Sequence, residues 1–501
     1  MPLPPQTPPP LPRLSRHAVK AVLDATGAEL QWAWSLVQTL KHPETLNDDF
    51  SADLLEFQPR LVEAIVRLEA FARAVRAEQK RLKRDQKRYV KSWLKHRQSL
   101  LGLYLTALTA SLASARAVGD GFAWFFHEKD RRLIGEHLKH PRLADVPIGV
   151  GGLGERLLVH SLPHLDGRIL IYHGTTTFLR IGDATLIDLP SRRVHAIAEL
   201  KTRKIKDGEY KLSLHFIADA RAKLPRTPKI GKRVRAEAEA TEPELKPELQ
   251  ERLDAQLKRM GGALKNAKAR KAAVRLGKQS EFHFGELSDA VGRATTRRFT
   301  LVQAGPALVI GTLRHRGGGS FNADLKGSGD LFQTLLNGIA DRVIGIMAPG
   351  RPDNAVFIDV PGSGDTLPVT RQGLPLAWWP MDDEALADIL FGRVMAVTFY
   401  NPAHLRLAME NRGLFPTDMP DLLRGTLEGR RVELSAIRHF DWMIQHNFMS
   451  LDSVVAMLDD TLKSAVEQSA DGRVRVEINA QVTTGDAAHE GDEDGDIAPT
   501  D

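Results

Sequence analysis

Apolar residues recur at steps of three and four along the first part of the chain, as at Leu61, Ile65 and Leu68. This spacing places them on one face of an α-helix, so residues 14–145 are predicted to form an α-helical N-terminal domain. Within it, the basic run 76–98 is predicted to be one long amphipathic helix with a solvated cationic face, and the apolar run 100–118 a buried helix.

A different pattern begins near residue 146. Short apolar runs bounded by turn residues occur at 167–174, 175–189, 193–205, 210–218, 299–313 and 354–362, as is typical of strands. Helical patterns at 154–162 and 329–347 lie among them. We therefore predict a mixed α/β domain over residues 146–365.

The remaining segments are predicted from their composition. The proline-rich residues 1–13 and the acidic residues 483–501 are expected to be disordered tails. Residues 366–482 are predicted to be mainly helical, with a late strand at 474–482.

Composition excludes several kinds of chemistry. The chain has 501 residues, a formal net charge of +6 and no cysteine. The absence of cysteine excludes disulfides, zinc–thiolate sites, iron–sulfur clusters and cysteine nucleophiles. Prolines interrupt the N-terminal segment and no run of 18 apolar residues occurs, so neither a signal peptide nor a membrane span is expected. We expect a cytoplasmic protein without a membrane partner.

Positive charge is concentrated in one segment. Between residues 201 and 278 there are 22 Lys and Arg against 10 Asp and Glu. Residues 219–295 are predicted to be a basic helical insertion, either a solvated exposed arm or a clamp on nucleic-acid phosphates. The candidate nucleic-acid contacts are Lys204, Lys232, Arg233, Arg235, Lys265, Lys268, Arg270 and Lys271.

The pattern Glu-x-Lys occurs four times, beginning at Glu78, Glu199, Glu209 and Glu244. Only the copy at Glu199 ends an apolar β-run. Side chains two residues apart share a face of a strand, so Glu199 and Lys201 are expected to point in the same direction.

A hairpin supplies a second carboxylate. If the turn between the runs 175–189 and 193–205 is centred on Ser191, Asp183 lies directly opposite Glu199 and Asp188 pairs with Val194. Opposed antiparallel residues have Cβ atoms about 4.5–5.5 Å apart, a spacing at which two carboxylates can share a metal ion. A slip of one residue would separate them.

Two carboxylates and a lysine on one face are a minimal set for phosphodiester hydrolysis. A divalent ion polarises the phosphate and generates hydroxide near neutral pH, Mg²⁺ prefers oxygen ligands, and a lysine can stabilise developing negative charge. His173, at the end of the strand expected beside Asp183, is a further candidate phosphate contact. The alternative is a surface cluster in which Lys201 or Arg180 only neutralises the two acids.

The order of these pieces resembles the PD-(D/E)XK nuclease superfamily. A Gly-Glu pair at 154–155 opens a helix, Gly-Asp at 182–183 precedes an apolar run, and Glu-Leu-Lys-Thr at 199–202 ends the next one. The resemblance covers residues 152–204, with glycine in place of the proline that gives the motif its name. It implies a central mixed sheet flanked by helices.

The resemblance also implies roles for individual residues. Asp183 and Glu199 would be the principal ligands of Mg²⁺ or Mn²⁺, Glu155 an accessory metal or water ligand, and Lys201 the catalytic lysine. Members of the superfamily often add a glutamine from the next helix, which makes Gln333 a candidate.

The leading hypothesis is therefore a magnesium-dependent DNA endonuclease, with RNA as another possible substrate. The resemblance implies a bacterial defence role against phage, or a mobile-element role, with protein partners in a multi-component system. Two alternatives stand beside it. One is a nuclease-fold protein that binds DNA or a partner without cleaving it, and the other is a structural subunit that docks through its long helices.

Overall fold

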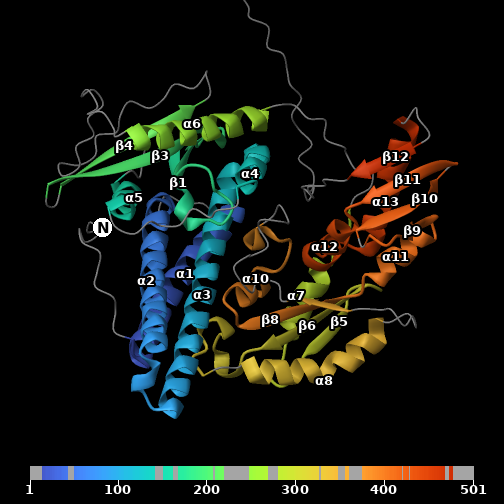
Figure 1. Ribbon diagram of the computed structural model, residues 1–501, viewed down its shortest axis with the longest axis horizontal. Helices are drawn as coiled ribbons and strands as arrows, with labels where there is room; N and C mark the ends of the chain where they lie inside the picture. The colour runs from blue at the N-terminus through green and yellow to red at the C-terminus, as the bar shows by residue number, and fades with distance from the viewer. Residues whose placement is uncertain are drawn as a thin grey trace, which may run out of the picture.

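The computed structural model describes residues 14–42, 50–140, 150–161, 168–206, 209–218, 247–268, 280–326, 329–347, 356–359, 375–419, 421–427, 429–468 and 473–477. They form a mixed α and β protein, in which long N-terminal helices are followed by three small sheets (Figure 1). The mixed class predicted from the sequence is confirmed. Both predicted tails lie outside the described residues.

The N-terminal helices are α1 (Arg16–Lys41), α2 (Phe50–Arg84), α3 (Lys91–His127) and α4 (Arg131–Leu138). The prediction of one helix over 76–98 is wrong, because α2 ends within this run, a 3-10 turn η2 (Gln86–Arg88) follows, and α3 then begins. Leu82 and Leu101 are buried in one apolar cluster, whereas a continuous helix would hold them roughly 28 Å apart. Burial of both side chains therefore requires the chain to reverse.

Helix α3 is the one helix among the described residues with the length and apolar composition of a membrane span. It packs against α1 and α2 and buries residues along much of its length, including Leu108 and Val118. Part of its apolar surface therefore lies against α1 and α2 within the N-terminal helices.

The first sheet, sheet A, contains β1 (Arg168–Tyr172), β2 (Ala184–Asp188), β3 (Arg193–Lys206) and β4 (Glu209–Ala218) in chain order. All three strand pairs are antiparallel. Among the described residues it is therefore an antiparallel meander and not the mixed sheet that the resemblance implies. The connections between these strands are shorter than the dozen residues that a parallel crossover requires.

One helix covers each face of sheet A. Helix α5 (Val150–Ser161) packs Leu153, Leu157 and Leu158 against alternate residues of β3, namely Ala196, Ala198 and Leu200. Helix α6 (Pro247–Lys268) packs on the other face, where Met260 and Ala263 contact Ile197. Because side chains alternate along a strand, Glu199 and Lys201 belong to the α6 face.

The position of α6 corrects the expectation of an exposed arm over 219–295. Its apolar residues recur at steps of four and three, at Leu253, Leu257, Met260 and Leu264, and they pack inward. The rest of the expected arm falls largely outside the described residues, except for α7 (Phe284–Gly292), which is part of the large core.

The second sheet, sheet C, has the order β5-β6-β8-β7, from β5 (Thr300–Gln303), β6 (Leu308–Arg314), β8 (Val394–Tyr400) and β7 (Phe357–Asp359). The strands near 300–314 and 357–359 thus form a sheet separate from sheet A, although one α/β domain was predicted over 146–365. Strand β8 lies in the segment predicted to be mainly helical. Its run of apolar and β-branched residues, between Gly392 and Pro402, favours a strand. Helices α8 (Gly329–Met347) and α10 (Asp383–Leu390) pack nearby.

The third sheet, sheet D, has the order β12-β11-β10-β9. It contains β9 (Leu414–Pro416), β10 (Leu422–Leu427), β11 (Arg430–Ser435) and β12 (Arg473–Glu477), and only the β11–β12 pair is parallel among these described strands. Strand β12 overlaps the late strand predicted at 474–482. Helices α11 (Ala403–Glu410), α12 (Ile437–Asn447) and α13 (Leu451–Gln468) complete this part.

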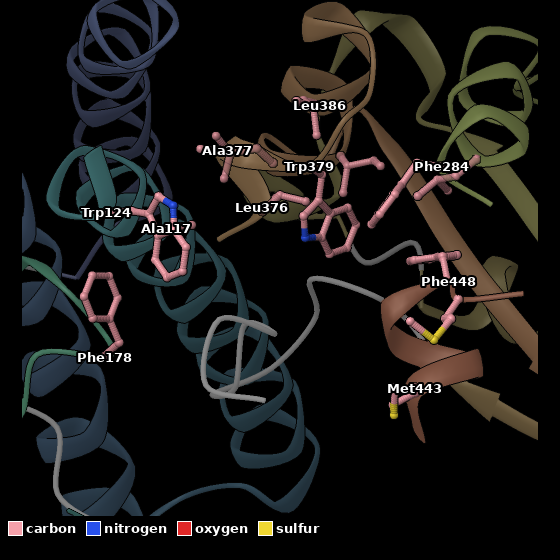
Figure 2. Close-up of a cluster of buried hydrophobic side chains, with 14 of the residues drawn as sticks. Ala117, Trp124, Phe178, Phe284, Leu376, Ala377, Trp379, Leu386, Met443 and Phe448 are labelled. Carbon is pink, nitrogen blue, oxygen red and sulfur yellow. The ribbon is translucent and has the colours of Figure 1, made fainter. Parts of the chain in front are cut away.

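One large apolar core joins the N-terminal helices to the C-terminal half (Figure 2). Trp379 is 2% exposed and lies against Phe284 and Phe448, with ring centroids 5.3 and 5.6 Å away. The neighbouring Trp378 donates its indole N–H to the Gly121 carbonyl on α3 at 2.8 Å. Both tryptophans therefore stabilise the packing between the two halves.

Candidate active site

The predicted acidic residues meet where β2 begins beside the middle of β3. Gly182 precedes Asp183 with φ +74°, a conformation that glycine adopts without strain and proline cannot adopt. A Cβ on Gly182 would also lie 2.8 Å from the Ala198 carbonyl oxygen. Glycine therefore lets the chain enter β2 directly against β3.

The register next to the site agrees with the prediction. Strands β2 and β3 pair Ala184 with Ala198, Thr185 with Ile197, and Leu186 with Ala196. The paired residues end at Ala184 and Ala198, and the Asp183 amide donates to the same Ala198 carbonyl at 2.8 Å. Asp183 therefore lies just before β2, against the part of β3 that contains Glu199. The prediction that Asp188 pairs with Val194 is wrong. A bulge between Leu186 and Ile187 shifts the register, and Asp188 pairs with Arg193.

Backbone contacts fix the orientation of Asp183. One carboxylate oxygen, Oδ2, accepts the Leu200 amide at 2.7 Å, directly between Glu199 and Lys201. The Asp183 carbonyl accepts the amide of His173 at 2.9 Å. The Asp183 side chain is therefore held against the Glu-x-Lys segment by the two neighbouring strands.

Helix α5 brings the third predicted carboxylate. Glu155 is 7% exposed, and the Tyr172 hydroxyl at the end of β1 donates a hydrogen bond to its Oε2. The helix approaches β3 so closely at Gly154 that a Cβ there would lie 1.7 Å from Thr202 Oγ1. The small residue before Glu155 thus allows the carboxylate to reach the site. Tyr172 was not predicted, although its alternation with Leu170 places it on the α5 face.

Lys201 has two partners. Its ammonium donates to Glu199 Oε1 at 2.8 Å and to Gln256 Oε1, on α6, at 3.0 Å. The glutamine that contacts Lys201 is therefore Gln256, whereas the predicted candidate Gln333 is exposed on α8 and donates to Asn337 at 2.9 Å. The apolar spacing of α6 was the signal that could have placed Gln256 over sheet A.

Burial and mutual repulsion raise the pKa values of two carboxyl groups. Burial, and then the charge of Glu199, raise the pKa of Asp183 to about 7, although the Leu200 amide and Lys201 oppose the shift. Burial, and then the charge of Asp183, raise the pKa of Glu155 to about 8. The charges of Asp183 and Glu199 both act to raise the pKa of Glu155, and Lys201 opposes them, and such perturbed carboxyl groups are common at functional positions.

The donor set fits a hard divalent cation. Carboxylate oxygens are what Mg²⁺ and Mn²⁺ prefer, and a cation would relieve the repulsion that otherwise keeps protons on Asp183 and Glu155. Within the described ranges, however, no three Asp, Glu or His side chains lie close enough to form a complete ligand cluster. Asp183 and Glu199 are thus the pair that could hold an ion, with other ligands left to water.

His173 does not face the site as a phosphate contact. It is fully buried, where its Nδ1 pairs with the Gly182 carbonyl at 2.9 Å and its Nε2 with Thr185 Oγ1 at 2.7 Å. Burial lowers its pKa to about 3. Together with the fully buried His127 and His137 it forms a group that we call the histidine cluster, in which burial lowers all three pKa values. The cluster supports the loop that leads into β2.

The predicted nucleic-acid contacts are only partly placed. Lys204 lies on β3 and Lys268 at the end of α6, Lys265 is exposed on α6, and the others fall outside the described residues, namely Lys232, Arg233, Arg235, Arg270 and Lys271. Lys265 is nine residues beyond Gln256, which places it on the opposite side of the helix. The exposed residues Arg252 and Arg259 are four before and three after Gln256, so they share its side.

Comparisons with known proteins give no relative for this chain: no family model, no curated protein and no solved structure matches it.

Proposed function

We propose that the protein is a divalent-metal-dependent nuclease that hydrolyses phosphodiester bonds of DNA. The observation that supports the proposal is that the Asp183 carboxylate accepts the Leu200 amide at 2.7 Å, between Glu199 and Lys201, while the Lys201 ammonium lies 2.8 Å from the Glu199 carboxylate. Two acids and a lysine in this arrangement are what metal-assisted phosphodiester hydrolysis requires.

Each residue then has a role. Asp183 and Glu199 hold the cation, which supplies polarisation of the phosphate and a hydroxide nucleophile near neutral pH when bound. Lys201 stabilises negative charge that develops on the phosphate oxygens. Gln256 positions Lys201 through the 3.0 Å hydrogen bond. Glu155 acts as an accessory acid, because its raised pKa lets it hold a proton near neutral pH.

A second candidate is a nuclease-fold protein that binds nucleic acid without cleaving it. The observation in its favour is that Lys201 already has both Glu199 and Gln256 as partners. Such an arrangement can also serve as a partly buried ion pair with a structural role.

The test compares the wild type with Glu199→Gln on supercoiled plasmid, linear duplex, single-stranded DNA and RNA, with Mg²⁺, with Mn²⁺ and with EDTA. Glu251→Gln is the matched control, because Glu251 is exposed on α6. We expect cleavage that requires the metal and falls on the order of 100-fold or more in Glu199→Gln, the usual effect of removing one group that stabilises a transition state. The control should cleave like the wild type.

Two results would count against the proposal. Equal cleavage by Glu199→Gln would mean that the activity lies elsewhere or in a contaminant. Binding without cleavage of any of these substrates would favour the second candidate. Anti-phage defence in the cytoplasm, the context that the resemblance implies, predicts that cells producing the wild type resist phage and that cells producing Glu199→Gln do not.

A further inference from the structure

A second concentration of positive charge lies at the turn between α2 and α3. We call residues 80–97 the hairpin tip. It contains nine Lys and Arg and one acid, Asp85, so its net charge of +8 exceeds the +6 of the whole chain. The run was predicted as one face of a straight helix, but the reversal of the chain gathers these charges at one end of two helices.

Most of this charge is not neutralised within the protein. Arg81 and Arg97 pair with Glu78, Arg84 pairs with Asp85, and Arg88 also interacts with Asp85. Five more cations are exposed and have no acidic partner among the residues that the structure describes: Lys80, Lys83, Lys87, Lys91 and Lys95. The first turn of α3 also contains no acid, so Lys91 stands at the positive end of a helix dipole. Repulsion among these groups favours an anionic partner.

An aromatic pair is embedded in this charge. The rings of Tyr89 and Trp93 stack with centroids 5.0 Å apart and an interplanar angle of 29°. Trp93 is nevertheless 46% exposed, so part of its ring remains open to solvent. Exposed aromatic rings among cations are what proteins use to bind nucleic acid, because bases stack on the ring while phosphates contact the cations.

The composition of the tip favours nucleic acid over a membrane. An interfacial membrane helix needs a broad exposed apolar face, whereas the large exposed apolar side chains among residues 80–97 are only Val90 and Trp93. Leu82 and Leu101 point into the apolar cluster between the helices. What remains outside is mainly positive charge, which suits a polyanion.

The distance from the tip to the candidate active site also suits nucleic acid. On α2, Gln58 contacts the backbone of β1 at Leu170 and Tyr172, and it therefore marks the end of the helix next to sheet A. From Gln58 to Arg84 the helix rises roughly 39 Å, about one turn of B-DNA. Figure 1 shows sheet A and the hairpin tip at opposite ends of α2 and α3.

We propose that the hairpin tip is a nucleic-acid-binding surface, which contacts the backbone about one helical turn away from the candidate active site. The choice of nucleic acid as partner rests on the proposed function. The phosphates bind Lys87, Lys91 and their neighbours, and Trp93 stacks on an unpaired base where the strand is single.

The test is equilibrium binding in EDTA, which makes it independent of cleavage. Fluorescence anisotropy with a duplex of about 40 base pairs, longer than one turn, compares the full-length wild type with Lys87→Gln/Lys91→Gln. The control is Arg297→Gln/Lys463→Gln, which removes the same charge at exposed positions elsewhere. We expect the slope of log K against log salt to fall by about 2 in the tip variant, because each phosphate contact contributes about 0.9. The control should keep the wild-type slope.

Two further arms complete the test. Trp93→Ala should weaken binding of a single strand about 10-fold and leave duplex binding nearly unchanged. Vesicles of phosphatidylcholine and phosphatidylserine report on a membrane partner. An unchanged slope in the tip variant, an equal loss in the control, or tip-dependent binding to vesicles but not to nucleic acid would overturn the proposal. If the protein binds nucleic acid through the hairpin tip but cleaves none of the substrates, the proposed nuclease activity is rejected and the proposed binding surface is supported.

Discussion

Replacing Glu155 by glutamine tests the electrostatics of the candidate site most directly. Burial, and then the charge of Asp183, raise the pKa of Glu155 from 4.5 to about 8. The folded protein therefore keeps a proton that the unfolded chain releases above pH 4.5. The stabilisation that protonated Glu155 contributes to the free energy of unfolding is fully present below pH 4.5, and it is lost as the pH rises toward 8.

The expected size follows from the shift. Each pH unit between the two pKa values costs about 1.4 kcal/mol, so pH 6 to pH 8 removes about 2 kcal/mol from the wild type after allowance for partial exposure. Glutamine does not ionise, so Glu155→Gln does not lose this stability. The free energy of unfolding of the variant, relative to that of the wild type, should therefore rise by about 2 kcal/mol between pH 6 and pH 8. The histidine cluster is present in both proteins and cancels in the comparison.

The assay is urea denaturation of the full chain in EDTA at pH 6, 7 and 8, with the exposed Glu251→Gln as the control. Added Mg²⁺ should stabilise the wild type more at pH 8 than at pH 6, because the cation competes with the protons on Asp183 and Glu155. A difference between wild type and Glu155→Gln that does not change with pH would refute the raised pKa. An absence of any Mg²⁺ effect at pH 8 would refute the cation site.

Three further predictions concern the structure around the site. The histidine cluster is neutral when folded and becomes protonated on unfolding below about pH 6.5, so thermal stability should fall steeply from pH 6.5 to 5, by up to about 4 kcal/mol per pH unit; a flat profile would contradict its burial. Gly154→Ala places a Cβ against Thr202 and should destabilise the protein by about 1–3 kcal/mol in denaturation, whereas Gly102→Ala, with open space around its Cβ, should be neutral or stabilising. If the nuclease assignment holds, Gln256→Ala should lower kcat about 10-fold and Lys201→Met more, and equal effects would mean that Gln256 does not merely position the lysine.

The register of β2 on β3 was more predictable from sequence than the rest of the fold. It required only alternation along two strands and one turn, and the predicted register is observed from Ala184 opposite Ala198 to Leu186 opposite Ala196. That Asp183 lies directly opposite Glu199 stays a prediction. Next to the turn the predicted partner of Asp188 is off by one residue, because a bulge between Leu186 and Ile187 precedes a four-residue loop in which Arg192 has φ 49°. No apolar pattern reveals such a bulge, since the residues on either side remain buried.

The larger errors have different causes. In the run 76–98 most residues are charged or polar, so no apolar pattern marked the point where the chain reverses. The reversal is required because Leu82 and Leu101, on opposite sides of the turn, are buried in the same cluster. Strand β8 pairs with β6 and β7 from distant parts of the chain, so no local pattern could assign it to sheet C. Sequence patterns predict which residues are buried, but the partners that bury them depend on long-range packing.

The packing of α6 changes how the basic insertion must be understood. A detached arm could bind phosphates without any effect on the site, but α6 covers one face of sheet A and also holds Lys201 through Gln256. The cations on the same side as Gln256 are Arg252 and Arg259, so a phosphate bound there lies over the Glu-x-Lys segment. Under the proposed function, the insertion would link binding of nucleic acid to the geometry of the lysine, because a shift of α6 on the sheet would move Arg252, Arg259 and Gln256 together.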